Sequence, residues 1–136
     1  MDDEIFQFVW NRAKSICEYC LLPQKCSHLT FEVDHIIAAC HGGATELSNL
    51  ALTCFYCNRY KGPNIAGLDP VSKKLSPLFH PRRHKWRRHF RYDGPVLVGL
   101  TRVGRATIFV LHINDPDAVA LRKALVESGE WQVASR

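Results

Sequence analysis

Apolar and polar residues recur with two different periods along the chain, and these periods predict a mixture of helices and strands. Residues 3–16 have apolar side chains at helical spacing, with acids first and bases later, which predicts an amphipathic helix. Residues 31–37 alternate like a strand, Gly42-Gly43 interrupts the pattern, and residues 50–53 predict the returning strand. A short helix follows over 56–61. The buried face of the first helix would comprise Ile5, Phe8, Val9, Ala13 and Ile16.

The second half of the chain has a weaker pattern. Residues 63–81 are rich in Pro and Gly and are expected to be extended, whereas Asp93-Gly94 predicts a tight hairpin turn before a strand over 96–100. Thr101 favours a helix start, but the β-branched residues of 107–113 favour a strand, and both interpretations stay open. A final helix should begin at Asp115-Pro116. Its buried side chains would be Val119, Leu121, Leu125 and Val126.

The size and composition of the chain limit its class. Its 136 residues, 46% hydrophobic and 23% charged, suit one globular domain of mixed α+β class. No apolar run is long enough to cross a bilayer, which argues against a membrane partner, and the acidic N-terminus lacks the pattern of a signal peptide. An intracellular, cytoplasmic and reducing location is therefore expected. The oligomeric state is left open.

Two Cys-x-x-Cys pairs, at residues 17–20 and 54–57, lie on either side of the two predicted strands. In a reducing compartment such pairs favour a zinc site with four thiolates, which has no open position for substrate and is structural. The alternative is four unrelated buried cysteines. Cys26 and Cys40 fall outside the pairs and are expected to be buried. The zinc ligands would be Cys17, Cys20, Cys54 and Cys57.

Three polar residues between and beside the pairs suit hydrolytic chemistry. Asp34 on the first strand and Asn58 on the short helix offer oxygen ligands for a hard cation such as Mg²⁺ or Mn²⁺. His35 has an ordinary pKa near neutrality and could accept a proton from an attacking water. A lone Asp-His pair is more often a structural hydrogen bond. Its position between two Cys-x-x-Cys pairs favours the catalytic interpretation.

The spacing His-x13-Asn-x8-Asn, formed by His35, Asn49 and Asn58, resembles the HNH endonuclease family over residues 12–62. The resemblance implies a ββα-metal fold, His35 as the general base and a catalytic cation held by Asp34 and Asn58. It also implies that Asn49 holds the loop and orients the histidine, and that cleavage of DNA leaves 3′-hydroxyl and 5′-phosphate ends. The family often has proline where this chain has Ala38, a departure that concerns the loop and not the chemistry.

Beyond Gly62 the chain is also similar to a subgroup of small bacterial HNH proteins. The similarity rests on three segments, Leu-Phe-x-Pro-Arg at 78–82, Gly-Leu-Thr at 99–101 and Gly-Arg-Ala-Thr at 104–107. It implies no further chemistry. We expect residues 1–62 to form the zinc-stapled nuclease core with its N-terminal helix. Residues 63–136 would form a basic hairpin-plus-helix extension packed on that core, within one compact unit.

The positive charge of the chain is concentrated in one segment. Residues 62–91 hold eight Lys or Arg and one acid, while the rest of the chain holds ten bases and twelve acids. This asymmetry indicates a polyanionic partner, DNA first and RNA second. The interleaved Trp86, Phe90 and Tyr92 are more typical of core anchors than of stacking platforms. The expected phosphate contacts are Arg59, Lys61, Arg82, Arg83, Lys85, Arg87, Arg88 and Arg91, and the surface histidines are His41, His80, His84 and His89.

The function that these patterns predict is metal-dependent hydrolysis of DNA. Two alternatives remain: a zinc-stabilised nucleic-acid-binding module without activity, and a subunit of a larger nuclease or mobile-element machine. An intact set of Asp34, His35 and Asn58 favours the enzyme, because binding alone needs no base beside a cation.

Overall fold

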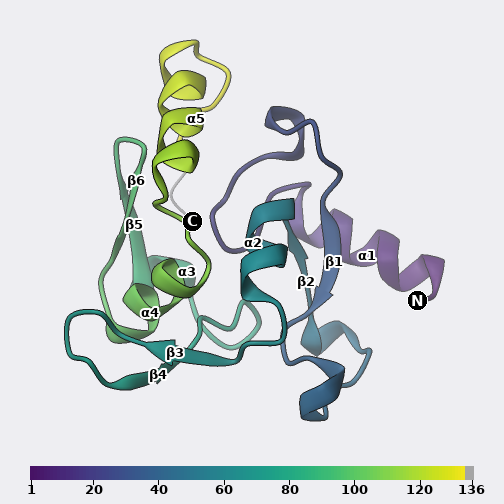
Figure 1. Ribbon diagram of the computed structural model, residues 1–136. Coiled ribbons are helices and arrows are strands. Elements are labelled where there is room, and N and C mark those ends of the chain that lie inside the picture. Colours follow the sequence, from purple (N-terminus) through teal and green to yellow (C-terminus); the bar gives the residue numbers. More distant parts are fainter. Residues whose placement is uncertain (134–136) are drawn as a thin grey trace.

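The computed structural model describes residues 1–133, whose helices and strands gather into two lobes (Figure 1). The N-terminal lobe, residues 1–64, holds α1 (Asp3–Ala13), β1 (Glu32–His35), β2 (Leu50–Thr53) and α2 (Phe55–Lys61). The C-terminal lobe, residues 65–133, holds β3 (Ala66–Leu68), β4 (Leu75–Pro77), α3 (Trp86–His89), β5 (Phe90–Asp93), β6 (Val96–Gly99), α4 (Arg102–Val110) and α5 (Pro116–Glu127). Short 3₁₀ turns occupy Gln24–Cys26, Ala39–His41 and Leu47–Asn49. None of the helices within residues 1–133 is long and apolar enough to cross a membrane.

The N-terminal lobe is a ββα unit on which α1 packs. Asp2 caps α1 by accepting the Glu4 N–H at 2.7 Å, and acids fill the first turn, as the helix dipole favours. β1 and β2 are antiparallel, with His35 opposite Leu50. Cys54 then caps α2 with its thiol. The ββα core, the N-terminal helix and the α+β class are confirmed.

The C-terminal lobe consists of two β-hairpins packed around α4. β3 pairs with β4, β5 pairs with β6, and both pairs are antiparallel. Thr101 caps α4 by accepting the Gly104 N–H at 3.1 Å. Of the two conformations left open for this segment, the helix is therefore the one that forms. Gly104 is required there, because a Cβ would lie 2.1 Å from the His89 carbonyl oxygen.

The segments 78–82, 99–101 and 104–107 meet one another in this lobe. The Thr107 hydroxyl accepts the Phe79 N–H at 2.8 Å, and the Thr101 hydroxyl bonds His89 Nδ1 at 2.7 Å. Arg105 holds Asp69 through two hydrogen bonds of 2.9 and 2.8 Å. These motif residues therefore build the lobe, and their role in the described structure is architectural.

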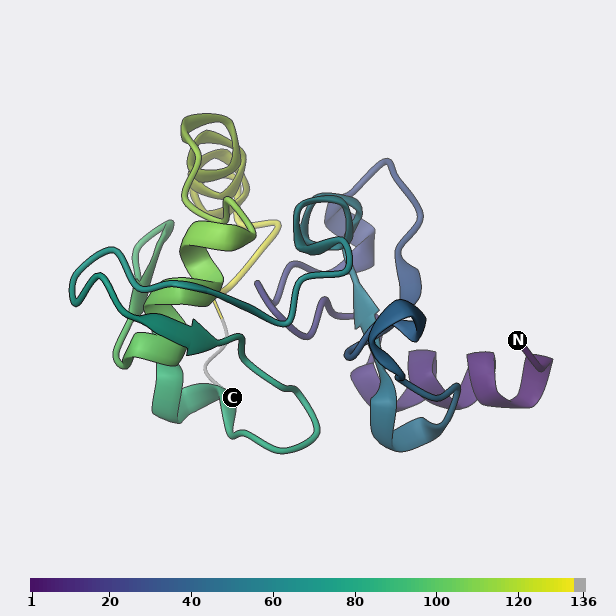
Figure 2. The same ribbon diagram turned by 60° about the horizontal axis from the view of Figure 1, so that its bottom comes forward.

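The two lobes lie side by side (Figure 2). They are joined through the first cysteine turn, residues 17–20, and one hydrophobic core contains side chains from both lobes. Three consecutive residues of this turn each contact the C-terminal lobe: Glu18 pairs with Arg82, the Tyr19 carbonyl accepts Trp86 Nε1–H at 2.8 Å, and the Cys20 carbonyl accepts the Tyr92 hydroxyl. Trp86 and Phe90 are buried, which confirms them as core anchors. The inward-facing side chains of residues 82–92 thus help to hold the two lobes together.

Several expectations for individual residues were wrong. Phe8 is 50% exposed under the Arg12 guanidinium, because α1 contacts the lobe along a narrower stripe that includes Val9 and Ala13. Leu121 and Val126 are exposed because α5 packs along one side only. Residues 63–81, expected to be an extended stretch, instead contain the paired strands of the β3–β4 hairpin.

The remaining corrections concern cysteine and histidine. Cys40 is exposed and Cys26 is half-buried, since neither lies in the core. His80 is buried and not on the surface, because its Nδ1 accepts the backbone N–H groups of Arg82 and Arg83. Burial, followed by the charge of Arg83 and by His84, lowers the pKa of His80 to about 4.

Candidate functional site

The first candidate centre is a cluster of four buried cysteine sulfurs. Cys17, Cys20, Cys54 and Cys57 have their Sγ atoms within 4.8 Å of one another, and Cys20 lies 3.8 Å from Cys54. Tetrahedral zinc with Zn–S bonds of about 2.3 Å sets sulfurs about 3.8 Å apart. The cysteines therefore fit a structural zinc ion that ties the turn after α1 to the start of α2.

The protonation of these thiols also calls for a cation. Burial opposes ionisation of Cys17, yet hydrogen bonds from the other three thiols leave its pKa well below the usual range. Hydrogen bonds with Cys17 are the main reason that the pKa values of Cys54 and Cys57 are well raised. Hydrogen bonding within the cluster thus favours ionisation of one thiol and opposes ionisation of its neighbours. A cluster with four thiolates needs a metal ion to balance the charge.

The second candidate centre lies where α2 packs against β1. Asn58 Nδ2 donates to the Glu32 carboxylate, and one turn later Lys61 Nζ lies 3.4 Å from Asp34 Oδ2. Glu32 and Asp34 are two residues apart and share one face of the strand. The Asn58 amide oxygen stays available, because a carboxylate can only accept from the amide nitrogen. Hard oxygen donors are therefore offered beside the helix, in the chemistry that Mg²⁺ or Mn²⁺ prefers.

Lys61 is buried and not a surface cation. Its side chain is 2% exposed, and Nζ donates to the His35 carbonyl at 3.1 Å and approaches the Gly62 carbonyl at 3.5 Å. The ammonium group thus joins the end of β1 to the end of α2. In this position the ammonium group can hold the Asp34 carboxylate in place.

His35 stands at the end of β1 with its ring half-buried. Its Nε2 lies 2.8 Å from the Thr45 hydroxyl in the following loop and is engaged in a hydrogen bond. Nδ1 is the other nitrogen of the ring. Thr45 and Glu32 are not among the candidate residues that the sequence indicates. The alternation of the strand could have shown Glu32, which is two residues before Asp34, but no local pattern marks Thr45.

Asn49 holds the loop that carries Thr45. Its Oδ1 accepts the Ile37 N–H at 2.9 Å, and its Nδ2 donates to the carbonyls of Ile37 and Ala44, both at 2.9 Å. Gly43 passes so close that a Cβ would lie 1.7 Å from the Ile37 oxygen. The loop between the strands is therefore fixed at both ends, and its shape requires glycine at residue 43.

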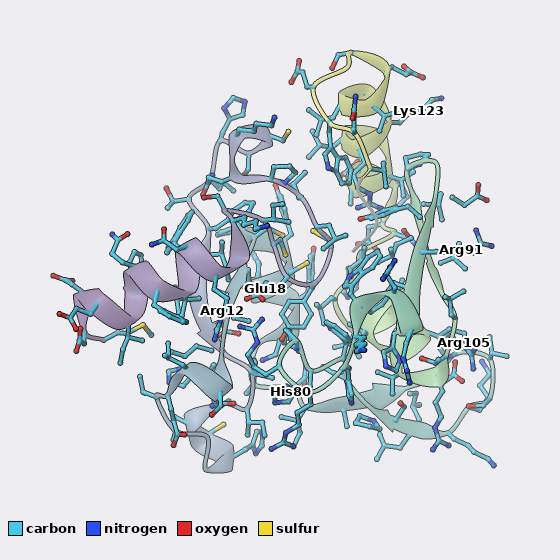
Figure 3. The ribbon with its side chains drawn as sticks, turned by 180° about the vertical axis from the view of Figure 1, so that it is seen from behind. Arg12, Glu18, His80, Arg91, Arg105 and Lys123 are labelled. Carbon is cyan, nitrogen blue, oxygen red and sulfur yellow. The ribbon has the colours of Figure 1, made fainter. Side chains whose placement is uncertain are left out.

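The basic residues divide into two groups by exposure. The buried Glu18 lies at the junction of the lobes (Figure 3). Arg82 pairs with it, and the Arg82 guanidinium also approaches the Leu50 carbonyl at 3.4 Å. The outward group consists of the exposed Arg83, Lys85, Arg87, Arg88 and Arg91, with Arg59 exposed separately on α2. Three of its members, Lys85, Arg87 and Arg88, line a depression of about 550 Å³ near Phe79 and Trp86.

Comparison with known proteins agrees with this geometry. No curated protein and no solved structure gives a match. Residues 17–64 match the family model described as HNH endonuclease. The matched segment begins at the first zinc-cluster cysteine and ends just after α2, so it covers both candidate centres. At residues 17–64 the chain is therefore similar to the HNH endonuclease family, and this similarity is consistent with the fold and with the cysteine cluster.

Proposed function

We propose that this protein is a metal-dependent DNA endonuclease whose active centre lies between β1 and α2. The observation that carries the proposal is the packing of α2 on β1 inside the family-matched segment, which brings Asn58 and Lys61 against the face of Glu32 and Asp34. Asp34 and Asn58 would hold a Mg²⁺ or Mn²⁺ ion. When bound, the ion supplies positive charge to the phosphate oxygens and to the leaving 3′-oxygen.

In this proposal His35 acts as the general base. Since Nε2 is engaged by Thr45, Nδ1 is the nitrogen that takes the proton from the attacking water. The water oxygen bonds to phosphorus as the bond from phosphorus to the 3′-oxygen breaks. The products are a 3′-hydroxyl and a 5′-phosphate end. Asn49 keeps the loop in the shape that brings Thr45 to the ring, and Lys61 fixes the Asp34 carboxylate.

The role of Asp34 can be tested by a change that keeps its shape. Asp34→Asn removes the negative charge but leaves an oxygen acceptor for the buried Lys61. We expect the Mg²⁺ concentration that half-saturates plasmid cleavage to rise at least about tenfold, because loss of a direct ligand should cost at least as much as loss of a supporting residue. Asn58→Ala should shift it in the same direction, while the melting temperature stays close to that of the parent.

Two controls make this test specific. Asp117→Asn, on exposed α5, should leave the Mg²⁺ requirement unchanged. An Asp34→Asn variant with the parent's Mg²⁺ dependence would place the cation elsewhere and would refute the assignment.

We further propose that residues 1–62 form the catalytic unit and that residues 63–136 hold the DNA. The outward basic group supports this division, because its cations have no acid partners among the described residues 1–133. Residues 63–136 would then contribute the affinity for DNA, and the catalytic unit would contribute the chemistry.

Replacement of Arg83, Lys85, Arg87 and Arg88 by Gln measures that affinity. The slope of log affinity against log salt should fall by about 0.9 for each phosphate that the protein no longer neutralises, on every duplex sequence alike. Cleavage at saturating DNA should persist. Lys25→Gln with Lys123→Gln, two exposed lysines elsewhere, serves as the control. An unchanged slope would show that these four residues form a solvated face without phosphate contacts. A lower melting temperature would show that they support the fold.

A further inference from the structure

The β3–β4 hairpin exposes an apolar face where a surface hairpin would ordinarily be polar. Gly67 and Ser76, which pair across the strands, face α4: a Cβ on Gly67 would lie 2.3 Å from Val110 Cγ2, and Ser76 is buried. The opposite face carries the pairs Leu68–Leu75 and Ala66–Pro77. Leu68 is 54% exposed and Leu75 69%. Small residues thus fill the inner face and apolar ones face the solvent.

The turn at the end of this hairpin is rigidly held. The fully buried Asp69 carboxylate accepts the backbone N–H groups of Val71 and Ser72 at 3.1 and 3.3 Å and both hydrogen bonds from Arg105. The Asp69 carbonyl accepts the Lys73 N–H at 2.8 Å. The turn therefore presents Val71, 72% exposed, in one fixed conformation. An exposed apolar surface that is held this firmly marks an interaction site.

The charges around the apolar face indicate what kind of partner it fits. Asp69 is the only acid in residues 62–91, and it is buried against Arg105, so the outer surface of this segment offers no carboxylate. Lys73 and Lys74 stand exposed beside Val71. The tip points away from the N-terminal lobe and is free to meet a large partner (Figures 1 and 2). A polyanion with apolar surface between its charges matches this arrangement. A second copy of the chain would bring like charges together.

We propose that the hairpin 66–77 lies in a groove of duplex DNA, an inference that rests on the nuclease function proposed above. A two-stranded ribbon is of a size that a DNA groove admits. Leu68, Val71 and Leu75 contact sugars and base edges, as apolar wedges do in proteins that bend DNA, and the two lysines neutralise the flanking phosphates. The hairpin is thus a second DNA contact, separate from the outward group of residues 83–91.

The test replaces the three apolar side chains by Ser, as Leu68→Ser, Val71→Ser and Leu75→Ser in one variant. Affinity for a duplex longer than the protein should fall at least about tenfold, because burying even one such side chain is enough for a change of that size. The slope of log affinity against log salt should stay unchanged. Lys73→Gln with Lys74→Gln should instead lower that slope by up to about 1.8. All these residues are exposed, so the melting temperature should not fall.

Leu121→Ser with Val126→Ser, on the exposed side of α5, is the matched control and should leave affinity unchanged. If the triple variant binds DNA as tightly as the parent, the inference is overturned. It is also overturned if the parent sediments as a dimer and the triple variant as a monomer, because the apolar face would then bind a second copy of the chain. If the parent neither binds nor cuts DNA, the proposed function itself fails. If the parent cleaves DNA and this cleavage requires His35, but the triple variant binds DNA like the parent, only the proposed DNA contact of the hairpin is refuted.

Discussion

His35→Ala should abolish most DNA cleavage while leaving the protein folded. A positioned general base contributes about a hundredfold to ten-thousandfold to the rate, and the proposal gives this role to His35 alone. The ring is half-buried and its side-chain hydrogen bond goes to the exposed Thr45, so its loss leaves little of the fold unsupported. Plasmid nicking rates at saturating DNA and Mg²⁺ measure the effect.

The same samples should keep their zinc content, melting temperature and DNA affinity. His28→Ala, an exposed histidine in the loop before β1, provides a matched control with an unchanged rate. If His35→Ala cuts DNA as fast as the parent, the base lies elsewhere or the activity belongs to a contaminant.

Cys54→Ala should remove both the zinc and the fold of the N-terminal lobe. Structural zinc sites contribute about 10–16 kcal/mol of apparent binding free energy, which is comparable to or greater than the whole stability of a typical domain. Cys54 also caps α2, a helix of seven residues that is too short to persist alone. The contacts of residues 18–20 with Arg82, Trp86 and Tyr92 would weaken with it.

Metal analysis and thermal melting check this prediction. The parent should contain one zinc per chain, and Cys54→Ala should lack both zinc and a cooperative melt. Cys40→Ser changes an exposed cysteine outside the cluster and should retain both. A zinc-free Cys54→Ala protein that melts like the parent would show that the four cysteines are merely packed together.

The ββα core can be predicted closely because its signals are local. The alternation of residues 31–37 and the break at Gly42-Gly43 predict a strand that returns at residues 50–53, where β2 lies. The two Cys-x-x-Cys pairs predict the sulfur cluster. The hairpin turn at Asp93-Gly94 and the start of α5 likewise follow from the residues at those positions. Such elements carry their turn and cap chemistry in a few neighbouring residues.

The rest depends on partners that are distant in sequence. β3 and β4 have three residues each and are held by α4 and by Arg105 on Asp69, 36 residues away, so no alternation could reveal them. α4 forms despite its β-branched residues, since Thr107 donates to the Val103 carbonyl and packing outweighs propensity. The burial of Lys61 and the pairing of Glu18 with Arg82 likewise could be known only from the folded structure. In each case a long-range contact decides what a charged or weakly patterned segment does.

The central claim is that the chain uses two cations separately, a structural zinc and a second divalent ion where DNA is cut. Its most direct test is incubation of the purified, zinc-loaded protein with supercoiled plasmid, with and without added Mg²⁺ or Mn²⁺. We predict cleavage to 3′-hydroxyl and 5′-phosphate ends only when Mg²⁺ or Mn²⁺ is added, at constant zinc content. Binding of the plasmid without cleavage under every metal condition would contradict the claim and would identify the protein as a nucleic-acid-binding module.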